Sequence, residues 1–238
     1  MNKYVVKDFP RPDQSKVDIL AQFDVATVYE AQGKTGLVSD ELKPIASNQS
    51  ICGPAVTAVC YAGDNLMIHA AIETCKPGDI LVITTVGESK SGMIGELIVE
   101  ALRKRGVQGV IIDAGIRDVA RIRELGFPVW SKAIFSEGTT KVRAGWVNAP
   151  TVCGGTTIHP GDIIFADDDG VVNIRQEDID FAIEKSKQRM IKEANTKERI
   201  ARGELSLDFY NLRNVLKDND VVYYKDIQEL KEAKHEKV

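Results

Sequence analysis

Cysteine is scarce in this chain of 238 residues, and its four copies are widely spaced. Cys52, Cys60, Cys75 and Cys153 include no C-x-x-C pair and no cysteine–histidine cluster with the spacing of a zinc site. The sequence therefore predicts neither a structural zinc nor a disulfide framework. We expect small buried thiols in a protein of the reducing cytoplasm.

Long apolar runs and an excess of positive charge are also missing. No stretch approaches the roughly 20 apolar residues of a membrane-spanning helix, and the N-terminal segment MNKYVVKDFPRPDQSK has no apolar core of a secretory signal. Lys and Arg number 31 against 35 Asp and Glu, which gives a net charge of -4. That balance argues against a protein that neutralises nucleic-acid phosphates. We expect neither a membrane nor a nucleic acid as a partner.

The sequence does contain an alternation of strand and helix patterns. Apolar runs typical of buried strands occur at 51–61, 80–86 and 109–112, and an amphipathic helix pattern at 92–106 separates the last two. From 151 to 174 the pattern changes to short β segments with glycine-rich turns. This order predicts a layered α/β domain with a mixed sheet.

The C-terminal part differs in composition. From about residue 177 to 202 the chain is highly charged and helix-forming, with only a thin apolar stripe. Such a helix is typical of an element that covers another surface, for example on a neighbouring subunit. We therefore divide the chain into a core over 1–175 and a charged helical C-terminal extension over 176–238.

The segment GVIIDAGIRDVARI, at 109–122, contains the first candidate site residues. A buried strand is followed at once by Arg117 and Asp118, and in α/β folds ligands gather where strands end. The guanidinium of Arg117 suits a carboxylate or enolate oxygen, and the carboxylate of Asp118 suits Mg²⁺ or Mn²⁺. Gly115 would allow a sharp turn. The alternative is that Asp118 simply caps the next helix, which is a common role for aspartate.

A second candidate lies at GMIGELIV, where Gly95 and Glu96 precede an apolar helix face. If the helix starts at Gly95, the free N–H groups of Glu96, Leu97 and Ile98 form an anion site that fits a small carboxylate. The alternative is an ordinary glycine followed by a glutamate that favours the helix start.

The spacing of these two candidates resembles a known family signature. Glu96, twenty intervening residues and then Arg117–Asp118 are similar to the D-x20-R-D pattern of class II pyruvate aldolases of the RraA-like family, with glutamate in place of aspartate. These are the 4-hydroxy-4-methyl-2-oxoglutarate and 4-carboxy-4-hydroxy-2-oxoadipate aldolases. The resemblance covers roughly residues 50–210 and includes the following segments in order: GDNLMIHAAI, KPGDILVI, GVIIDAGIRDV, GFPVWSKAI, GDIIFADDDGVV and ARGELSLDFY.

The resemblance implies a layered β/β/α fold like that of swivelling domains, assembled as a homotrimer or homohexamer. It implies that Asp118 holds the divalent metal and that Arg117 contacts the pyruvate part of the substrate. It also implies that the backbone amides of Leu97 and Ile98, after Gly95, hold the substrate carboxylate. A glutamate from the neighbouring subunit's C-terminal helix approaches the site in this family, and Glu193 is the best match.

The activity implied is metal-dependent retro-aldol cleavage of a 4-hydroxy-2-oxo acid, with release of pyruvate, in the degradation of aromatic compounds. Glu96 or Glu193 would assist the base that takes the proton of the C4 hydroxyl. Oxaloacetate would lose CO₂ through the same enolate, so decarboxylase side activity is expected.

Several alternatives stay open at this point. The same fold family contains non-catalytic regulators that bind a ribonuclease, although those lack a long C-terminal extension. Lys132 would form a Schiff base with pyruvate if it were desolvated, although a snorkelling lysine is the more common case. His69, on a predicted helix, is expected to be a packed or surface histidine rather than a ligand.

Overall fold

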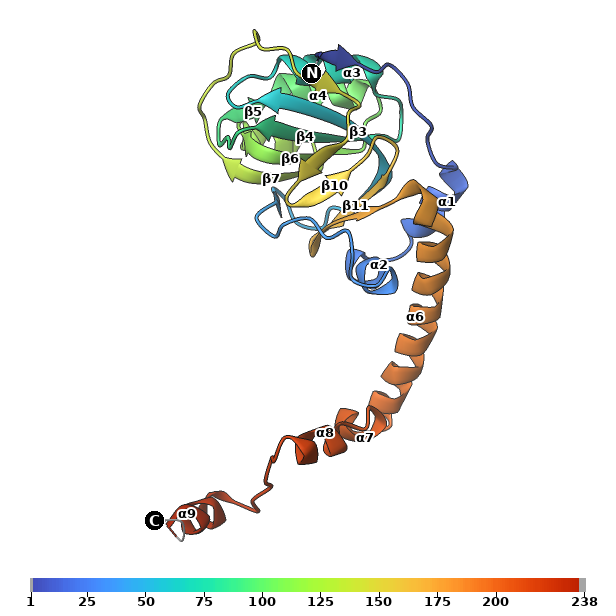
Figure 1. Ribbon diagram of the computed structural model, residues 1–238, viewed down its shortest axis with the longest axis vertical. Helices are drawn as coiled ribbons and strands as arrows, with labels where there is room; N and C mark the ends of the chain where they lie inside the picture. Colours follow the sequence, from blue (N-terminus) through green and yellow to red (C-terminus); the bar gives the residue numbers. More distant parts are fainter. Residues whose placement is uncertain (1, 236–238) are drawn as a thin grey trace. The chain divides into compact units, whose positions relative to one another are not determined.

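The computed structural model describes residues 2–235 and has the mixed α/β architecture that the sequence predicts (Figure 1). It divides into two compact units, Met1–Arg189 and Met190–Val238. Among the described residues, no helix combines the length and the apolar character needed to cross a membrane.

A mixed sheet forms the centre of the first unit. Its main path runs in the order β1 (Tyr4–Val5), β8 (Trp146–Val147), β3 (Ile51–Tyr61), β4 (Ile80–Val86), β6 (Gly109–Ile116), β7 (Val129–Ile134) and β2 (Lys43–Pro44). The four strands β3, β4, β6 and β7 are parallel to one another. Their continuous apolar runs are typical of parallel strands that are covered on both faces.

Helices cover one face of these parallel strands (Figure 1). They are α3 (Leu66–Thr74), α4 (Glu96–Lys104) and α5 (Val119–Glu124). Ile68, Val99 and Ile122 extend from them into a core that they share with Leu81 and Val110 of the sheet. Because each helix connects two parallel strands, the helix starts lie at the carboxyl ends of the preceding strands.

A second β layer covers the opposite face. Residues 51–54 of the long strand β3 pair antiparallel with β11 (Ile163–Asp167), which also pairs with β12 (Gly170–Ile174). A separate hairpin consists of β9 (Thr151–Cys153) and β10 (Thr156–Ile158). Beyond β11 and β12, a further core packs against α1 (Gln14–Leu20), α2 (Val25–Ala31) and the first turns of α6 (Ile179–Ala201).

Two local predictions are wrong. The helix expected over 92–106 begins only at Glu96, because Gly92–Ile94 forms the short strand β5 parallel to β6. Gly115 makes no turn and lies inside β6. A Cβ atom there would lie 1.9 Å from the carbonyl oxygen of Lys90, so glycine is needed because residues 90–94 lie directly against the strand.

The four cysteines are buried and free, as expected. Burial raises the pKa of Cys52, Cys60 and Cys75 to about 12 and raises the pKa of Cys153 as well. The thiols therefore stay protonated at neutral pH and pack as small apolar side chains.

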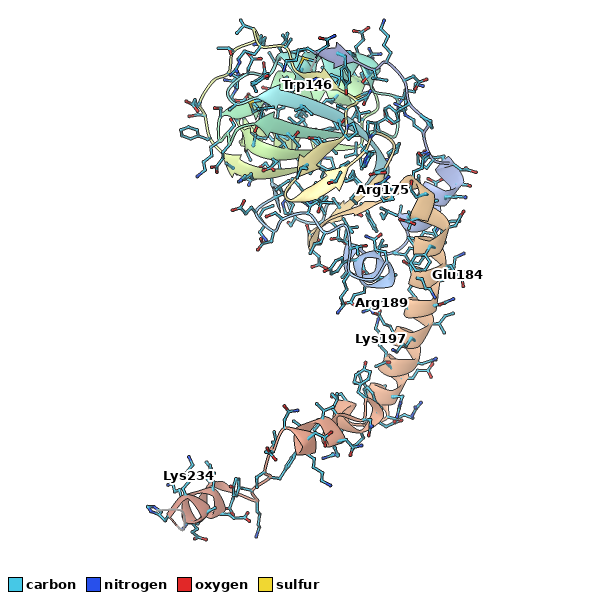
Figure 2. The ribbon with its side chains drawn as sticks, viewed as in Figure 1. Trp146, Arg175, Glu184, Arg189, Lys197 and Lys234 are labelled. Atoms are coloured by element: carbon cyan, nitrogen blue, oxygen red, sulfur yellow. The ribbon has the colours of Figure 1, made fainter. Side chains whose placement is uncertain are left out.

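The C-terminal extension begins with a 3-10 turn at Gln176–Asp178 and continues in α6, which carries charged side chains along its length (Figure 2). The described part of the second unit is helical, with α7 (Ser206–Phe209), α8 (Leu212–Asp218) and α9 (Ile227–His235). Arg199 lies 2.7 Å from Glu204 and 4.8 Å from the ring of Phe209, so local ion pairs and a cation–π contact stabilise this unit. Residues 236–238 of the predicted extension lie outside the described residues, and its packing on a neighbouring subunit stays a prediction.

Candidate active site

Five of the residues predicted for the site line one pocket of about 140 Å³. Gly95, Leu97 and Ile98 come from the start of α4, directly after β5, while Arg117 and Asp118 follow β6. Because β5 and β6 are parallel neighbours, the segments that follow them meet at one edge of the sheet. The remaining lining residues are Asn65, His69, Met93 and Lys141.

The start of α4 supplies backbone donors to this pocket. The helix begins directly after Gly95, and its first intrahelical hydrogen bond runs from the Val99 N–H to the Gly95 carbonyl over 3.1 Å. The N–H groups of Leu97 and Ile98 therefore have no partner within the helix. Together with the helix dipole, they make the pocket wall attractive to a carboxylate.

Asp118 occupies the N-cap position of α5 and has an unusual backbone conformation. Its backbone is left-handed, with φ 58° and ψ 30°, and its side chain makes no capping hydrogen bond to α5. Instead, its Oδ2 accepts the N–H of Glu96, the first residue of α4, over 3.2 Å. Asp118 is thus the N-cap residue of α5 by position, and its carbonyl accepts the Ile122 N–H over 3.1 Å, but its side chain binds the start of α4. A left-handed conformation is disfavoured for an L-residue by roughly 1–2 kcal/mol, although aspartate and asparagine tolerate it best.

Gly95 makes room for this carboxylate. A Cβ atom at position 95 would lie only 2.2 Å from Oδ2 of Asp118. The backbone of Gly95, with φ −144° and ψ −170°, is extended and open to any residue. Glycine is required here for the close approach of Asp118 and not for its own backbone freedom.

Replacing Gly95 with alanine is therefore expected to displace the Asp118 carboxylate. Because Asp118 is the predicted metal ligand, Mn²⁺ affinity and turnover should each fall by at least about tenfold, as is usual when a group that positions a metal ligand is changed. Isothermal titration with Mn²⁺ measures the change. In the background of Asp118→Asn, the same glycine replacement should add little, because the two changes act on one interaction. Fully additive losses would contradict this coupling.

Arg117 faces the pocket with its charge largely uncompensated. Its Nε lies 4.0 Å from Oδ2 of Asp118, and its side chain is 44% exposed. Within residues 2–235, no other carboxylate lies within ion-pair distance of this guanidinium. Because the planar fork has no bidentate partner among the described residues, it remains able to bind oxygen atoms of a ligand.

Three polar residues that the sequence did not predict for the site also line the pocket: Asn65, His69 and Lys141. Asn65 is buried, and its amide nitrogen donates to the Met93 carbonyl over 3.0 Å, while its Oδ1 has no partner among the described residues. The ring of His69 lines the pocket, where desolvation and the charge of Lys141 lower its pKa. His69 is therefore a neutral hydrogen-bonding group at neutral pH, and Lys141 adds a cation to the residues that line the pocket.

The loop 135–145, which carries Lys141, is fixed by a buried aspartate. Asp64 is 1% exposed, and its Oδ2 accepts the Thr140 hydroxyl over 2.6 Å and the N–H of Val142 over 2.7 Å. Burial alone would raise the pKa of Asp64, but these hydrogen bonds and those from the Leu66 and Arg143 amides lower it to about 2. The ionised carboxylate thus joins the loop to the start of α3.

This arrangement predicts an acid-sensitive contribution to stability. A carboxyl group whose pKa falls from 3.8 to about 2 on folding stabilises the protein above pH 4 and loses that contribution as the pH falls toward 2. We expect Asp64→Asn to lower the free energy of unfolding by about 1–2 kcal/mol at pH 7, and the difference from wild type to shrink below pH 4. Urea unfolding at several pH values measures this difference, and a constant gap would contradict the assignment.

Neither of the two predicted glutamates is among the residues that line the pocket. The Glu96 carboxylate is 3.4 Å from Nε of Arg121, an ion pair on the outer side of α4 and α5. Glu193 lies on α6 in the second unit. A role for either glutamate in assisting the base stays a prediction.

The chemistry of the pocket fits a hydrated divalent cation. Among the described residues, no three His, Cys, Asp or Glu side chains form a metal ligand set, so Asp118 would act with water. One carboxylate plus several waters is a common way for proteins to bind Mg²⁺. The side chain of Asp118 is 46% exposed, which leaves room for such a shell.

Lys132 does not have the surroundings of a Schiff-base lysine. It lies on β7 with its Nζ 3.2 Å from Glu41, 3.7 Å from Asp113 and 3.8 Å from Glu88. The hydrogen bond to Glu41 is the main reason that its pKa is raised. A nucleophilic amine needs the opposite shift, so the snorkelling interpretation agrees better with the structure.

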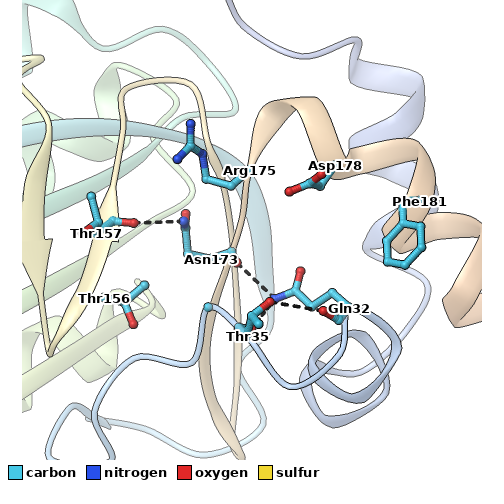
Figure 3. Close-up of a pocket in the computed structure, with 9 residues that line it drawn as sticks. Gln32, Thr35, Thr156, Thr157, Asn173, Arg175, Asp178 and Phe181 are labelled. Atoms are coloured by element: carbon cyan, nitrogen blue, oxygen red, sulfur yellow. Dashed lines mark hydrogen bonds between the residues drawn. The ribbon is translucent and has the colours of Figure 1, made fainter.

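A larger pocket of about 430 Å³ lies elsewhere, between α2, β10 and the segment that leads into α6 (Figure 3). Asn173, Arg175 and Asp178 are among its lining residues, and Gln32 donates to the Asn173 carbonyl there over 3.2 Å. It contains none of the predicted site residues. The smaller pocket is the candidate active site because it contains the predicted site residues.

Comparison with known proteins agrees with this architecture. A family model described as "RraA-like: Aldolase/RraA" matches residues 24–173. A protein of Halalkalibacterium halodurans named "Putative 4-hydroxy-4-methyl-2-oxoglutarate aldolase" is 30% identical over 179 residues, which are 74% of this chain and 85% of that protein.

Solved structures show the same fold. RraAS2 of Streptomyces coelicolor, titled an unusual member of the RNase ES inhibitor RraA protein family, is 25% identical with a TM-score of 0.73, over 80% of this chain and 99% of its own. An uncharacterized protein of Pseudomonas syringae is 22% identical with a TM-score of 0.72, over 83% and 97% of the two chains.

The structure is a layered α/β protein in which the start of α4 and an arginine–aspartate pair line one pocket. The family match covers more than half of the chain and includes the segments that first suggested the resemblance, except ARGELSLDFY at 201–210. The chain belongs to the RraA-like family.

Proposed function

We propose that this protein is a divalent-metal-dependent pyruvate aldolase, a carbon–carbon lyase that cleaves a 4-hydroxy-2-oxo acid. The observation that carries the proposal is the convergence of the α4 amides, the Arg117 guanidinium and the Asp118 carboxylate in one pocket. The substrates we favour are 4-hydroxy-4-methyl-2-oxoglutarate and 4-carboxy-4-hydroxy-2-oxoadipate. Relatives named for the first of these support that choice.

Each wall of the pocket has a part in binding. The free N–H groups of Leu97 and Ile98 hold the C1 carboxylate at the start of α4. Arg117 lies beside the 2-oxo oxygen, where its donors are placed for an oxyanion. Asp118 would hold Mg²⁺ or Mn²⁺, and a cation bound there supplies Lewis-acid polarisation of the 2-oxo group.

The reaction then consists of a proton transfer, a bond cleavage and a second proton transfer. The C4 hydroxyl loses its proton, and the C3–C4 bond breaks as C4 becomes a carbonyl carbon. The electron pair of that bond forms the enolate of pyruvate, whose oxygen Arg117 stabilises. C3 then takes a proton, and pyruvate leaves.

The same enolate forms when oxaloacetate loses CO₂, so decarboxylation is an expected side activity. Glu96, or Glu193 of a neighbouring subunit in a homotrimer or homohexamer, would assist the first proton transfer. Both the assembly and the roles of the glutamates belong to the proposal.

Pyruvate release, followed with lactate dehydrogenase, tests the proposal. Each substrate and oxaloacetate would be offered with Mg²⁺ or Mn²⁺ and again with excess EDTA. The proposal expects release that depends on the metal. Release that survives EDTA would contradict the class II chemistry, and folded protein without any release would favour a non-catalytic regulator that binds a ribonuclease or other protein.

A further inference from the structure

We infer that Lys141 selects substrates with a second carboxylate, and that Asp64 is the positioning residue that holds Lys141 at the pocket. The inference rests on the proposed aldolase function and deepens it, because it assigns the part of the substrate beyond C3 to particular residues. Neither residue belongs to the arginine–aspartate pair or to the α4 helix start.

Lys141 has no counterion in the described part of the chain. It lines the pocket from the loop 135–145, and its side chain is exposed. No carboxylate of residues 2–235 lies within ion-pair distance of its ammonium group, whereas Lys132, which lines no part of this pocket, lies 3.2 Å from Glu41. Its charge also acts on the neighbouring imidazole, since it lowers the pKa of His69. An unpaired ammonium beside a neutral histidine is well suited to bind an anion.

The other binding groups already have a role in holding the pyruvate half. The α4 amides take the C1 carboxylate, and Arg117 takes the 2-oxo oxygen. Lys141 is the remaining cation among the residues that line this pocket, and it comes from a different segment on the side of α3. A carboxylate on C4 is therefore expected to bind Lys141, with His69 as a neutral hydrogen-bonding neighbour.

Asp64 makes this placement stable. Besides the Thr140 hydroxyl and the Val142 amide, it accepts the Arg143 N–H over 3.1 Å, so its carboxylate holds residues on both sides of Lys141. The backbone adds a hydrogen bond from the Asn65 N–H to the Thr140 carbonyl over 2.9 Å. Because the loop is ordered before substrate arrives, little backbone freedom is lost on binding.

Two reactions that form the same enolate can distinguish binding of a second carboxylate by Lys141 from a general effect on catalysis. Cleavage of 4-hydroxy-4-methyl-2-oxoglutarate uses a substrate with two carboxylates, whereas exchange of the methyl protons of pyruvate in D₂O uses one carboxylate. For Lys141→Met, we expect kcat/KM for cleavage to fall about 10- to 100-fold, the effect of losing a charge-assisted contact. Most of this loss should be in KM, and the loss in kcat/KM for pyruvate exchange should be less than about threefold.

Lys141→Arg, which keeps the charge, should retain most of the wild-type kcat/KM for cleavage relative to that for pyruvate exchange. Lys104→Met, which removes an exposed lysine at the far end of α4, is the matched control and should leave both reactions unchanged. Equal losses in the two reactions of Lys141→Met, or no loss in either, would overturn the inference. If wild-type protein catalyses neither reaction, the proposed function itself has failed, which is a separate result.

Asp64→Asn tests the positioning role. It should raise KM for cleavage in the same direction as Lys141→Met, by roughly 3- to 10-fold, with kcat for pyruvate exchange preserved. The double variant should be no worse than Lys141→Met alone. A purely structural role would lower the active fraction for both reactions equally, and that result would remove Asp64 from the account.

Discussion

Replacing Arg117 with alanine is expected to lower kcat for pyruvate release by about 10²–10³-fold, the usual cost of removing one donor to a developing oxyanion. The guanidinium is the pocket's main fixed donor for the enolate oxygen, and its only carboxylate neighbour within the described residues is Asp118 at 4.0 Å. Steady-state kinetics with saturating metal measure the change.

The fold should survive this replacement. Arg117 is 44% exposed, and such an ion pair contributes at most about 1 kcal/mol to stability. Arg103→Ala, which removes an exposed arginine from the last turn of α4, is the matched control and should keep full activity. Near-normal turnover of Arg117→Ala would contradict the assignment of the site.

Replacing Asp118 with asparagine is expected to weaken Mn²⁺ binding by at least about 100-fold and to lower turnover by a similar factor, because the carboxylate is the charged oxygen ligand that the pocket offers. Asparagine tolerates the left-handed backbone of this position as well as aspartate does. Its amide oxygen also retains the hydrogen bond from the Glu96 N–H. The change therefore removes charge and little else.

Direct metal titration keeps this prediction independent of activity. Mn²⁺ binding, followed by isothermal titration or by water-proton relaxation, should be lost in Asp118→Asn. Asp220→Asn is a matched control because Asp220 is an exposed aspartate with a similar left-handed φ of 56° in the second unit. Unchanged Mn²⁺ affinity in Asp118→Asn would show that the metal, if one is used, binds elsewhere.

The sequence predicts the layered fold well because its signals are local. Buried strands such as GVII and ILVI have continuous apolar runs, and the start of α4 is marked by Gly95 before an apolar helix face. The meeting of Gly95 and Asp118 at one sheet edge was not predicted, because the short strand β5 was expected to be part of the helix.

The pocket residues Asn65, His69 and Lys141 were not predictable in this way. Asn65 and Lys141 lie far apart in the sequence and meet because Asp64 binds the loop 135–145, a contact that leaves no pattern in either segment. His69 was expected to be a packed or surface side chain. Gly115 was expected to make a turn, but its role is a close approach to Lys90, which depends on how residues 90–94 pack against β6. Such contacts are tertiary, and single-sequence periodicity contains no record of them.

The most direct test of the central claim is the exchange of pyruvate methyl protons in D₂O, followed by ¹H NMR. This reaction requires the enolate, the metal and the pyruvate half of the pocket, but it requires no knowledge of the natural substrate. We predict exchange with Mg²⁺ or Mn²⁺ that stops with EDTA and falls about 10²–10³-fold in Arg117→Ala. Folded wild-type protein that leaves the methyl signal unchanged with either metal would contradict the account.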